Sequence, residues 1–429
     1  MPGMEPLGSI TSGDFYLYLV LDLAITAGLV WLALSWKLGL PVASAPGRGA
    51  DRPLASAARL RLRRGLGLLW ILDGLLQAQP LMATRFASLV IAPVVHGQPG
   101  WLAQLLHLEI RLWQARPLDL AATSVLVQLG IGVAILAGGD SRLGRIGLWL
   151  SLGWALVVWV GGEAMGGILA TGASEVTGAP GAVLLYATAA TLLLIPGRYW
   201  VHGILPRAIR RGAGLFFLLG ALLQALPWEG FWARGGLRAS FLPMARMPEP
   251  HWVVAPIFAL ASFAQVHPAF LNSVLISLMA ALGAGLLVGG APRIWTGAAL
   301  VWLAAIWWLG QGLGGLGTGT ATDLNLAPLV ALLLVSAWLR PGPDLRFAVT
   351  GVRTASGEEL RRKLALGGLA ALVVGIVPAL VGLPLAAVET SSRTTTTTSA
   401  AAAGRVPDGP QLVLPHQVAG GGAEYDPGR

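Results

Sequence analysis

The chain has 429 residues, of which 55% are apolar and only 11% are charged. Soluble domains carry about 25% charged residues, so this chain lacks the polar side chains to cover a globular surface in water. The net charge of +9 lies in loops between apolar runs and indicates membrane orientation rather than nucleic-acid binding, and the absence of cysteine excludes disulfides and thiol catalysis.

The mean hydropathy of +0.70 and several runs long enough to cross a bilayer predict an all-α polytopic membrane protein of about ten spans. The first span, 16–36, has its basic residues after it, beginning with Lys37. A cleavable signal peptide has them before the apolar run, so we expect an uncleaved span with the N-terminus outside. The next four spans are predicted at about 65–81, 118–138, 146–169 and 181–196.

The segment 101–114 (WLAQLLHLEIRLWQ) is apolar on one face but too short to cross the bilayer. It is bracketed by Pro99 and Pro117, which suit helix starts and stops. We therefore predict an interfacial or re-entrant helix here.

The pattern then restarts. Residues 63–80 read RRGLGLLWILDGLLQAQP, and residues 210–227 read RRGAGLFFLLGALLQALP. Likewise 159–180 (WVGGEAMGGILATGASEVTGAP) matches 308–328 (WLGQGLGGLGTGTATDLNLAP), with Pro180 on Pro328. A match held through loops and spans predicts a tandem duplication. An even number of spans per copy makes the two four-helix repeats parallel, related by an axis along the membrane normal.

These patterns divide the chain into five predicted parts. They are an N-terminal span and basic loop (1–60), a first four-span repeat (61–200), a second repeat (201–345), a loop with a tenth span at about 364–388 (346–388), and a disordered outer tail (389–429). Basic residues are concentrated in the loops that this arrangement puts inside. We therefore expect a multi-pass protein of the bacterial plasma (inner) membrane with both termini outside, and with the loops at 170–181 and 317–327 also outside.

Ionisable residues within spans are costly and often functional. They are Asp22, Asp73 and Glu163, accompanied by Gln77 and Gln224. Counting along the spans suggests that Asp22, Asp73, Gln77 and Glu163 meet in an outward-facing polar cavity of the first repeat. In the second repeat Gln311 replaces Glu163 and Gly220 replaces Asp73. The alternative is that these groups form hydrogen bonds between helices.

The matched glycines also have two interpretations. They are Gly162, Gly166, Gly167, Gly310, Gly314 and Gly315. Small residues four apart favour close helix packing, which is the preferred interpretation. The alternative is a broken helix end that exposes backbone groups to a ligand at the Thr171-Gly172 and Thr318-Gly319 steps.

No motif assigns a catalytic residue, and no cofactor is predicted. None of the six histidines falls in the middle of a predicted span. One outer segment brings together Met244, Met247 and His251, whose thioether and imidazole groups are ligands that suit copper. Packing is the commoner role of such methionines, so this is a weak copper candidate and no other metal site is predicted.

The Arg-Arg-Gly start, the Leu-Leu-Gln-Ala-x-Pro end of the first span in each repeat, and the Gly/Glu-rich later spans resemble the DoxX/DoxD group of small bacterial membrane proteins. The G-E-x-x-G-G-x-x-x-T-G run at 162–172 also resembles a stretch of actinobacterial membrane proteins. The first resemblance implies membrane redox chemistry with a quinone, such as thiosulfate:quinone oxidoreduction, and it assigns no catalytic residue.

Three functional hypotheses follow. The favoured one is a membrane scaffold or accessory subunit, in contact with lipid and with other membrane or extracytoplasmic subunits, that carries an outward-facing polar site. The second is a DoxX-like, quinone-linked redox component. The third is a small-solute or copper transporter with its site between the two copies.

Overall fold

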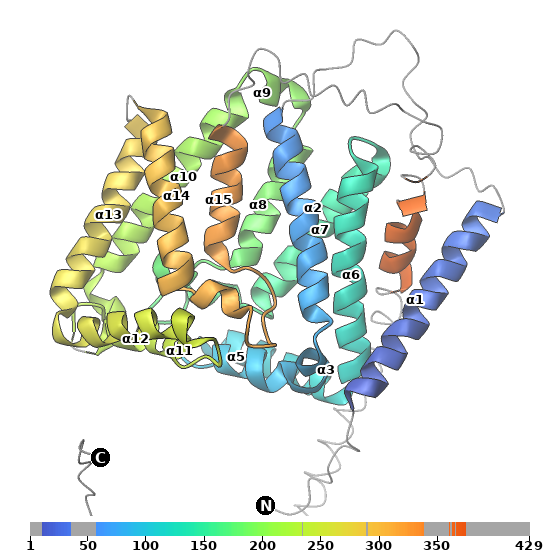
Figure 1. The fold of residues 1–429 in the computed structure, drawn as a ribbon, viewed down its shortest axis with the longest axis horizontal. Coiled ribbons are helices and arrows are strands. Elements are labelled where there is room, and N and C mark those ends of the chain that lie inside the picture. The colour runs from blue at the N-terminus through green and yellow to red at the C-terminus, as the bar shows by residue number, and fades with distance from the viewer. Residues whose placement is uncertain are drawn as a thin grey trace, which may run out of the picture. The chain divides into compact units, whose positions relative to one another are not determined.

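The structure is a computed structural model that describes residues 11–35, 57–233, 235–288, 291–338, 360, 363–364 and 366–374 (Figure 1). These residues are almost entirely helical, and no β-strand occurs among them. Of the predicted tenth span, residues 366–374 are helical, while 375–388 and the predicted tail at 389–429 lie outside the described residues.

Within the described ranges, seven helices have 18 residues or more. They are α1 (Ser12–Ser35), α2 (Ala57–Gln77), α6 (Pro117–Gly138), α7 (Arg142–Val160), α10 (Ile204–Ala225), α13 (Pro268–Val288) and α14 (Pro292–Leu309). The shorter α-helices are α3 (Pro80–Phe86), α4 (Ala92–Val94), α5 (Gly100–Ala115), α8 (Ala182–Leu194), α9 (Gly197–Val201), α11 (Gly236–Ala245), α12 (His251–Val266) and α15 (Leu326–Trp338). A π-helix, η1 (Ala87–Ile91), and four 3₁₀ turns, η2 (Ala164–Gly167), η3 (Glu175–Thr177), η4 (Pro227–Glu229) and η5 (Gly312–Gly315), complete the described elements.

Five of the described helices are long and apolar enough to cross a membrane: α1, α6, α7, α10 and α13. A sixth candidate is a broken span, in which α2 and the segment Pro80–Val94 meet at a bend of 71°. The predicted span 146–169 is wrong at its end, because α7 stops at Val160 and a non-helical segment follows. The predicted span 181–196 contains only the 13-residue α8, about 20 Å long against a hydrocarbon core of about 30 Å.

The helices form two groups, which we call the first bundle (α2, α6, α7, α8) and the second bundle (α10, α13, α14, α15). In the first, a methyl group placed on Gly132 of α6 would lie 2.6 Å from the carbonyl oxygen of Gly67 of α2. In the second, a methyl group on Gly283 of α13 would lie 2.8 Å from the carbonyl oxygen of Gly214 of α10. Glycine lets the two backbones approach closely at these crossings.

Each bundle has its own apolar core. One cluster of buried residues comes from 213–334, with Val176 as its one member from outside that range. A second cluster comes mainly from 58–209 and includes Leu329 and Leu333 of α15. Helix α15 packs against α2 and α8 as well as α10 and α14, and it therefore joins the two bundles (Figure 1).

Helices α5 and α12 run across the long helices at one end of the fold (Figure 1). The helix predicted at 101–114 is confirmed as α5, with Pro99 at its N-cap and Pro117 opening α6. At the start of α2, Arg59 and Arg63 both bind Oδ1 of Asp140, in the α6–α7 turn, at 2.6 and 2.5 Å. Burial raises the pKa of Asp140, but the two guanidinium groups outweigh it and hold that pKa below its usual value.

Candidate functional site: an acidic cavity in the first bundle

The helix breaks after α7 and α14 have the same backbone form. Met165 and Gly166 have φ of 57° and 64°, and Leu313 and Gly314 have φ of 52° and 73°. Positive φ extends over four successive residues in each break, from Ala164 to Gly167 and from Gly312 to Gly315, and left-handed backbone of this kind cannot continue a right-handed helix and favours glycine. The chain then continues as loops to α8 and α15, and the first loop contains the short 3₁₀ turn η3.

The matched glycines therefore do not form a small-xxx-small helix face. Helix α7 ends before Gly162 and α14 ends before Gly310, so the spacing does not lie within one helix. Close approach still matters, because a methyl group on Gly166 would lie 2.0 Å from the Pro180 carbonyl carbon. One on Gly310 would lie 2.2 Å from the carbonyl oxygen of Val176. The glycines are required by a tight turn and by a loop that packs back onto it.

Each break is tied to the helix that follows by a tryptophan and one polar side chain. In the first bundle, Trp159 donates to the Pro180 carbonyl at 2.7 Å, and Glu163 Oε1 accepts from the amide of Ala182 at 2.9 Å. In the second bundle, Trp307 donates to the Leu324 carbonyl at 2.8 Å. Gln311 there accepts from the Ala327 amide at 3.1 Å. The counterpart of Pro180 in this geometry is Leu324 rather than Pro328, the residue matched by sequence.

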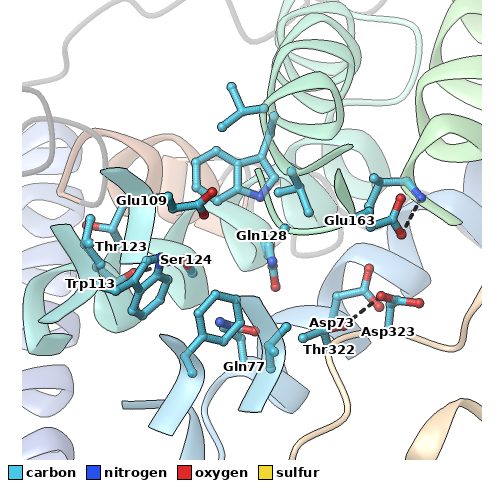
Figure 2. Close-up of a pocket in the computed structure, with 18 of the residues that line it drawn as sticks. Asp73, Gln77, Glu109, Trp113, Thr123, Ser124, Gln128, Glu163, Thr322 and Asp323 are labelled. Carbon is cyan, nitrogen blue, oxygen red and sulfur yellow. Dashed lines mark hydrogen bonds between the residues drawn. The ribbon is translucent and has the colours of Figure 1, made fainter. Parts of the chain in front are cut away.

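The first bundle encloses an inner cavity of about 300 Å³ (Figure 2). Apolar and aromatic side chains from α2, η1, α5, α6 and α7 line most of it, including Trp70, Trp113 and Trp154. Its polar groups are Asp73, Gln77, Glu109, Thr123, Ser124, Gln128, Glu163, Thr322 and Asp323. Apolar walls with a few convergent polar groups are typical of small-molecule sites.

A second, more polar cavity of about 440 Å³, which we call the vestibule, adjoins the inner one. The two share Val90, Gly162, Glu163, Thr322 and Asp323 as lining residues. The vestibule is otherwise lined largely by the glycine-rich loop 166–182, with His96 and Gln98. Glu163 and Asp323 therefore lie where the vestibule meets the inner cavity. Val90, also at this junction, belongs to the π-helix, a deviation that often occurs at functional sites.

Asp73, Glu163 and Asp323 form a group that we call the acidic cluster. Their charges lie close enough to act on one another, and Figure 2 shows Asp323 beside Asp73 with Glu163 nearby. The hydroxyl of Tyr186 lies next to Asp73, and its ring packs on Trp70 with centroids 4.6 Å apart. No lysine or arginine is among the described residues that line either cavity. Three neighbouring carboxyl groups without a basic partner favour protonated forms or a bound cation.

Asp323 was missed by the sequence argument because it belongs to the other bundle. Its carboxyl group accepts from the Thr322 hydroxyl at 2.8 Å and from the Asn325 amide at 2.5 Å, which fixes its direction in the loop. The loop of the second bundle thus supplies an acid to the cavity of the first. The sequence feature that could have identified Asp323 is its position as an acidic residue in a Gly/Thr-rich loop that contains no basic residue.

The loop of the first bundle likewise supplies a carboxyl group to the second bundle. Glu175, in the loop of the first bundle, is 2% exposed and lies beside Trp302 and Gly220 of the second bundle. A methyl group on Gly220 would lie 2.1 Å from Oε2 of Glu175. Gly220 is the sequence counterpart of Asp73, so a carboxyl group from the loop occupies the space that the aspartate side chain fills in the first bundle.

The predicted residues of the second repeat form a separate polar network. Ser174 donates to Gln224 Oε1 at 2.6 Å, and Gln224 Nε2 donates to Asn272 Oδ1 at 2.8 Å. Gln311 Nε2 reaches the Glu175 carbonyl at 3.5 Å. All of these groups are buried and hydrogen-bonded within the protein, so Gln224 and Gln311 serve to hold the loop onto the second bundle.

The expected meeting of four polar groups is wrong for Asp22. Asp73, Gln77 and Glu163 line one cavity, but Asp22 lies on α1 close to Asp119 and outside it. There the Tyr18 hydroxyl donates to Asp119 Oδ1 at 2.5 Å, a contact between α1 and the start of α6. Asp22 was predicted to lie at a membrane depth similar to that of Asp73 and Glu163. A similar depth does not determine which helices are neighbours, and α1 does not line the cavity.

The copper candidate is not assembled as a compact set of ligands. The sulfur atoms of Met244 and Met247 pack around the Gly312 turn, 3.7 and 3.5 Å from where a methyl group on that glycine would lie. His251 is the exposed first residue of α12. Over the described ranges, no group of three or more histidine, aspartate or glutamate side chains is arranged for a metal ion.

Glu109 adds a carboxyl group to the inner cavity from α5, outside the candidate membrane-spanning helices. A methyl group on Gly161 would lie 2.4 Å from its Oε2, so the end of α7 closes over it. Burial raises the pKa of Glu109 to about 7, although a hydrogen bond from Trp113 opposes the shift. This group changes charge near neutral pH.

No family model, no curated protein and no solved structure matches this chain.

Proposed function

We propose that the chain is a plasma-membrane protein of about ten spans, built from two parallel copies of a four-helix unit. The proposal is supported by features that recur at corresponding places: the glycine crossings, the left-handed turns after α7 and α14, and the tryptophan contacts of Trp159 and Trp307. Non-helical backbone at membrane depth is tolerated where protein or water surrounds it. The loops that precede α8 and α15 are packed against protein and so meet this condition. Each loop together with the short helix that follows it can then cross the membrane.

Within this architecture, the first bundle is proposed to bind a small organic cation with an apolar body, as an accessory subunit of a larger membrane assembly. The observation that carries this is the acidic cluster at the junction of two cavities that no basic residue of the described ranges lines. A cationic ligand would balance the carboxylates. Its apolar part would lie against Trp70, Trp113 and Trp154, whose rings also attract cations.

The test uses benzyltrimethylammonium as the probe and uncharged benzyl alcohol as its neutral comparison, titrated into purified protein in nanodiscs by calorimetry. The wild type is expected to bind the cation and to bind the alcohol far more weakly. Glu163→Gln, which keeps the shape of the side chain, is expected to lower cation affinity by at least about tenfold, because it removes one partner of a desolvated charge pair.

The matched control is Glu175→Gln, which neutralises a buried carboxyl group that packs against the second bundle and lines neither cavity. It is expected to leave cation affinity unchanged. Equal binding of the cation and the alcohol, or equal loss in both variants, would count against a cation site and would favour a structural role for the acidic cluster.

A second candidate function is quinone binding, which the DoxX/DoxD resemblance and the aromatic walls of the inner cavity favour. The rings of Phe86 and Trp113, 4.2 Å apart, offer a surface for a flat headgroup. Gln77 and Gln128 offer amide donors to its two oxygens. A quinone that co-purifies with the wild type, and is lost in Gln128→Leu, would favour this function over cation binding.

A further inference from the structure

A third cavity lies at the opposite end of the second bundle from the helix breaks. It has a volume of about 280 Å³ and lies between the start of α10, the start of α14 and the end of α15. Its lining residues are Pro206, Arg207, Arg210, Pro292, Arg293, Thr296, Leu334, Ala337 and Trp338. It has no lining residue in common with the inner cavity or the vestibule, so it is a separate feature of the molecule.

Three arginines converge on this cavity, and none of them has an aspartate or glutamate partner within the described ranges. Arg207 is held in place, because its Nε donates to the Gly203 carbonyl at 3.0 Å and its Nη2 to the His202 carbonyl at 3.2 Å. No other hydrogen bond of Arg207 occurs within the described residues, so its remaining N–H groups are available to a ligand. Guanidinium groups bind phosphate oxygens in pairs, which makes arginine the preferred residue for phosphate recognition.

Two further features suit a phosphate group that belongs to a lipid. Pro292 opens the 18-residue α14, so the positive end of that helix faces the same cavity. Leu334, Ala337 and Trp338 form an apolar wall next to the arginines. An indole ring beside basic residues at a helix end is typical of the membrane interface, where lipid headgroups lie.

We propose that Arg207, Arg210 and Arg293 form a binding site for a phosphate group, and that its natural ligand is the headgroup of an anionic phospholipid. The apolar wall would contact the glycerol and upper acyl region. The positive-inside pattern puts this end of the bundle on the cytoplasmic side, where anionic lipids attract basic pockets between spans.

The experiment is native mass spectrometry of the full chain in detergent, titrated with phosphatidylglycerol and, in parallel, with zwitterionic phosphatidylcholine of the same acyl chains. The wild type is expected to retain phosphatidylglycerol preferentially. The triple variant Arg207→Gln, Arg210→Gln, Arg293→Gln is expected to lose at least about tenfold in affinity for it, because each basic residue contributes to binding of an anionic headgroup.

A control triple variant makes the same change in charge elsewhere: Arg64→Gln, Arg142→Gln, Arg145→Gln. These three residues are exposed and line none of the three cavities, and the control is expected to bind phosphatidylglycerol like the wild type. Inorganic phosphate added at millimolar concentration distinguishes a lipid headgroup from free phosphate as the ligand. If it displaces phosphatidylglycerol and the protein shows no preference between the two lipids, the ligand is free phosphate and the lipid assignment is overturned. Equal retention of phosphatidylglycerol by both triple variants overturns the site itself.

Each variant is compared with the wild type by thermal unfolding, so that loss of lipid can be separated from loss of fold. Arg293→Lys provides a second check, because it retains the positive charge but not the paired N–H donors. An intermediate affinity is expected for it. The single variant Arg293→Gln is measured beside it. If Arg293→Lys binds as weakly as Arg293→Gln at wild-type stability, the paired N–H donors rather than the charge determine binding of the phosphate. If Arg293→Lys binds as tightly as the wild type, the positive charge alone is sufficient, which contradicts binding of phosphate oxygens by paired N–H donors.

Discussion

At the scale of single residues, glycines and carboxyl groups in this protein work as pairs. Gly161 leaves room for the Glu109 carboxyl, and Gly220 leaves room for that of Glu175. In both places a carboxyl oxygen lies where a methyl group would be, so the acid is held by the shape of its surroundings. Such enclosure costs free energy when the carboxyl is ionised, which makes these residues sensitive to pH.

Glu109 leads to a pH prediction. Its pKa is about 7 in the folded protein against an ordinary value of 4.5, so the folded state holds the proton more tightly than the unfolded chain. Stability is therefore greatest below about pH 4.5 and falls as the pH rises through about 7. One pKa unit corresponds to about 1.4 kcal/mol, and with solvent screening the loss is expected to be about 2 kcal/mol.

The measurement is thermal unfolding of the wild type and Glu109→Gln between pH 4.5 and pH 8. The variant carries no titrating carboxyl here and is expected to be the more stable protein at pH 8, by about 2 kcal/mol, with little difference at pH 4.5. If the two proteins lose stability in parallel over this range, another group is responsible for the pH dependence.

At the scale of elements, the two loops that follow the helix breaks each cross to the other bundle. The loop at 170–181 inserts Glu175 beside α10, and the loop at 317–325 brings Asp323 to the acidic cluster. Glu229, which follows α10, accepts from the Gly172 amide at 2.7 Å and so ties the first loop to the second bundle. Glu249 accepts from the Gly317 amide at 2.7 Å and holds the second loop to its own half of the chain. The inner cavity and the vestibule of the first bundle are therefore completed by residues of the second.

A double-mutant cycle tests the first of these insertions. Gly220→Ala places a methyl group 2.1 Å from Glu175 Oε2 and is expected to destabilise the protein by about 2 kcal/mol through overpacking. Glu175→Ala removes the obstructing oxygen, so in its background the glycine substitution is expected to cost at least about 1 kcal/mol less.

Gly212→Ala is the matched control on the same helix, since no atom lies within 4 Å of the added methyl group. It is expected to be neutral or slightly stabilising, because alanine favours helix over glycine. Additive effects of Gly220→Ala and Glu175→Ala would contradict the insertion of this loop.

The sequence predicts the elements better than it predicts their contacts. The apolar runs and proline positions located the helices and the transverse α5, because hydropathy and helix capping are local properties. The end of the span that corresponds to α7 was predicted at residue 169, beyond the helix end at Val160, since runs of glycine and apolar residues look alike in a span and in a buried turn. Asp73, Gln77 and Glu163 were predicted as neighbours from their depth, but Asp323 and Glu175 reach their sites through loop crossings that no repeat alignment contains.

At the scale of the whole molecule, the proposed parallel duplication requires both glycine-rich loops to lie on the same side of the membrane. The basic residues Arg59 and Arg63, paired with Asp140, mark the opposite end of the first bundle. In the topology that we propose from the positive-inside rule, the helix breaks, the vestibule and the acidic cluster lie toward the outside.

Because the chain contains no cysteine, single cysteines can report this topology without background. Thr171→Cys and Thr320→Cys lie in the two loops, and Arg142→Cys is at the first residue of α7, at the other end of that helix. In intact cells a membrane-impermeant maleimide is expected to label Thr171→Cys and Thr320→Cys, whereas Arg142→Cys should react only after permeabilisation. Labelling of the two loops from opposite sides of the membrane would contradict the parallel repeat. It would also contradict the hydrogen bonds that hold the loops to Glu229 and Glu249. Labelling of all three from outside would instead leave the repeat intact and contradict the span count between Thr171 and Arg142, because α7 alone separates them.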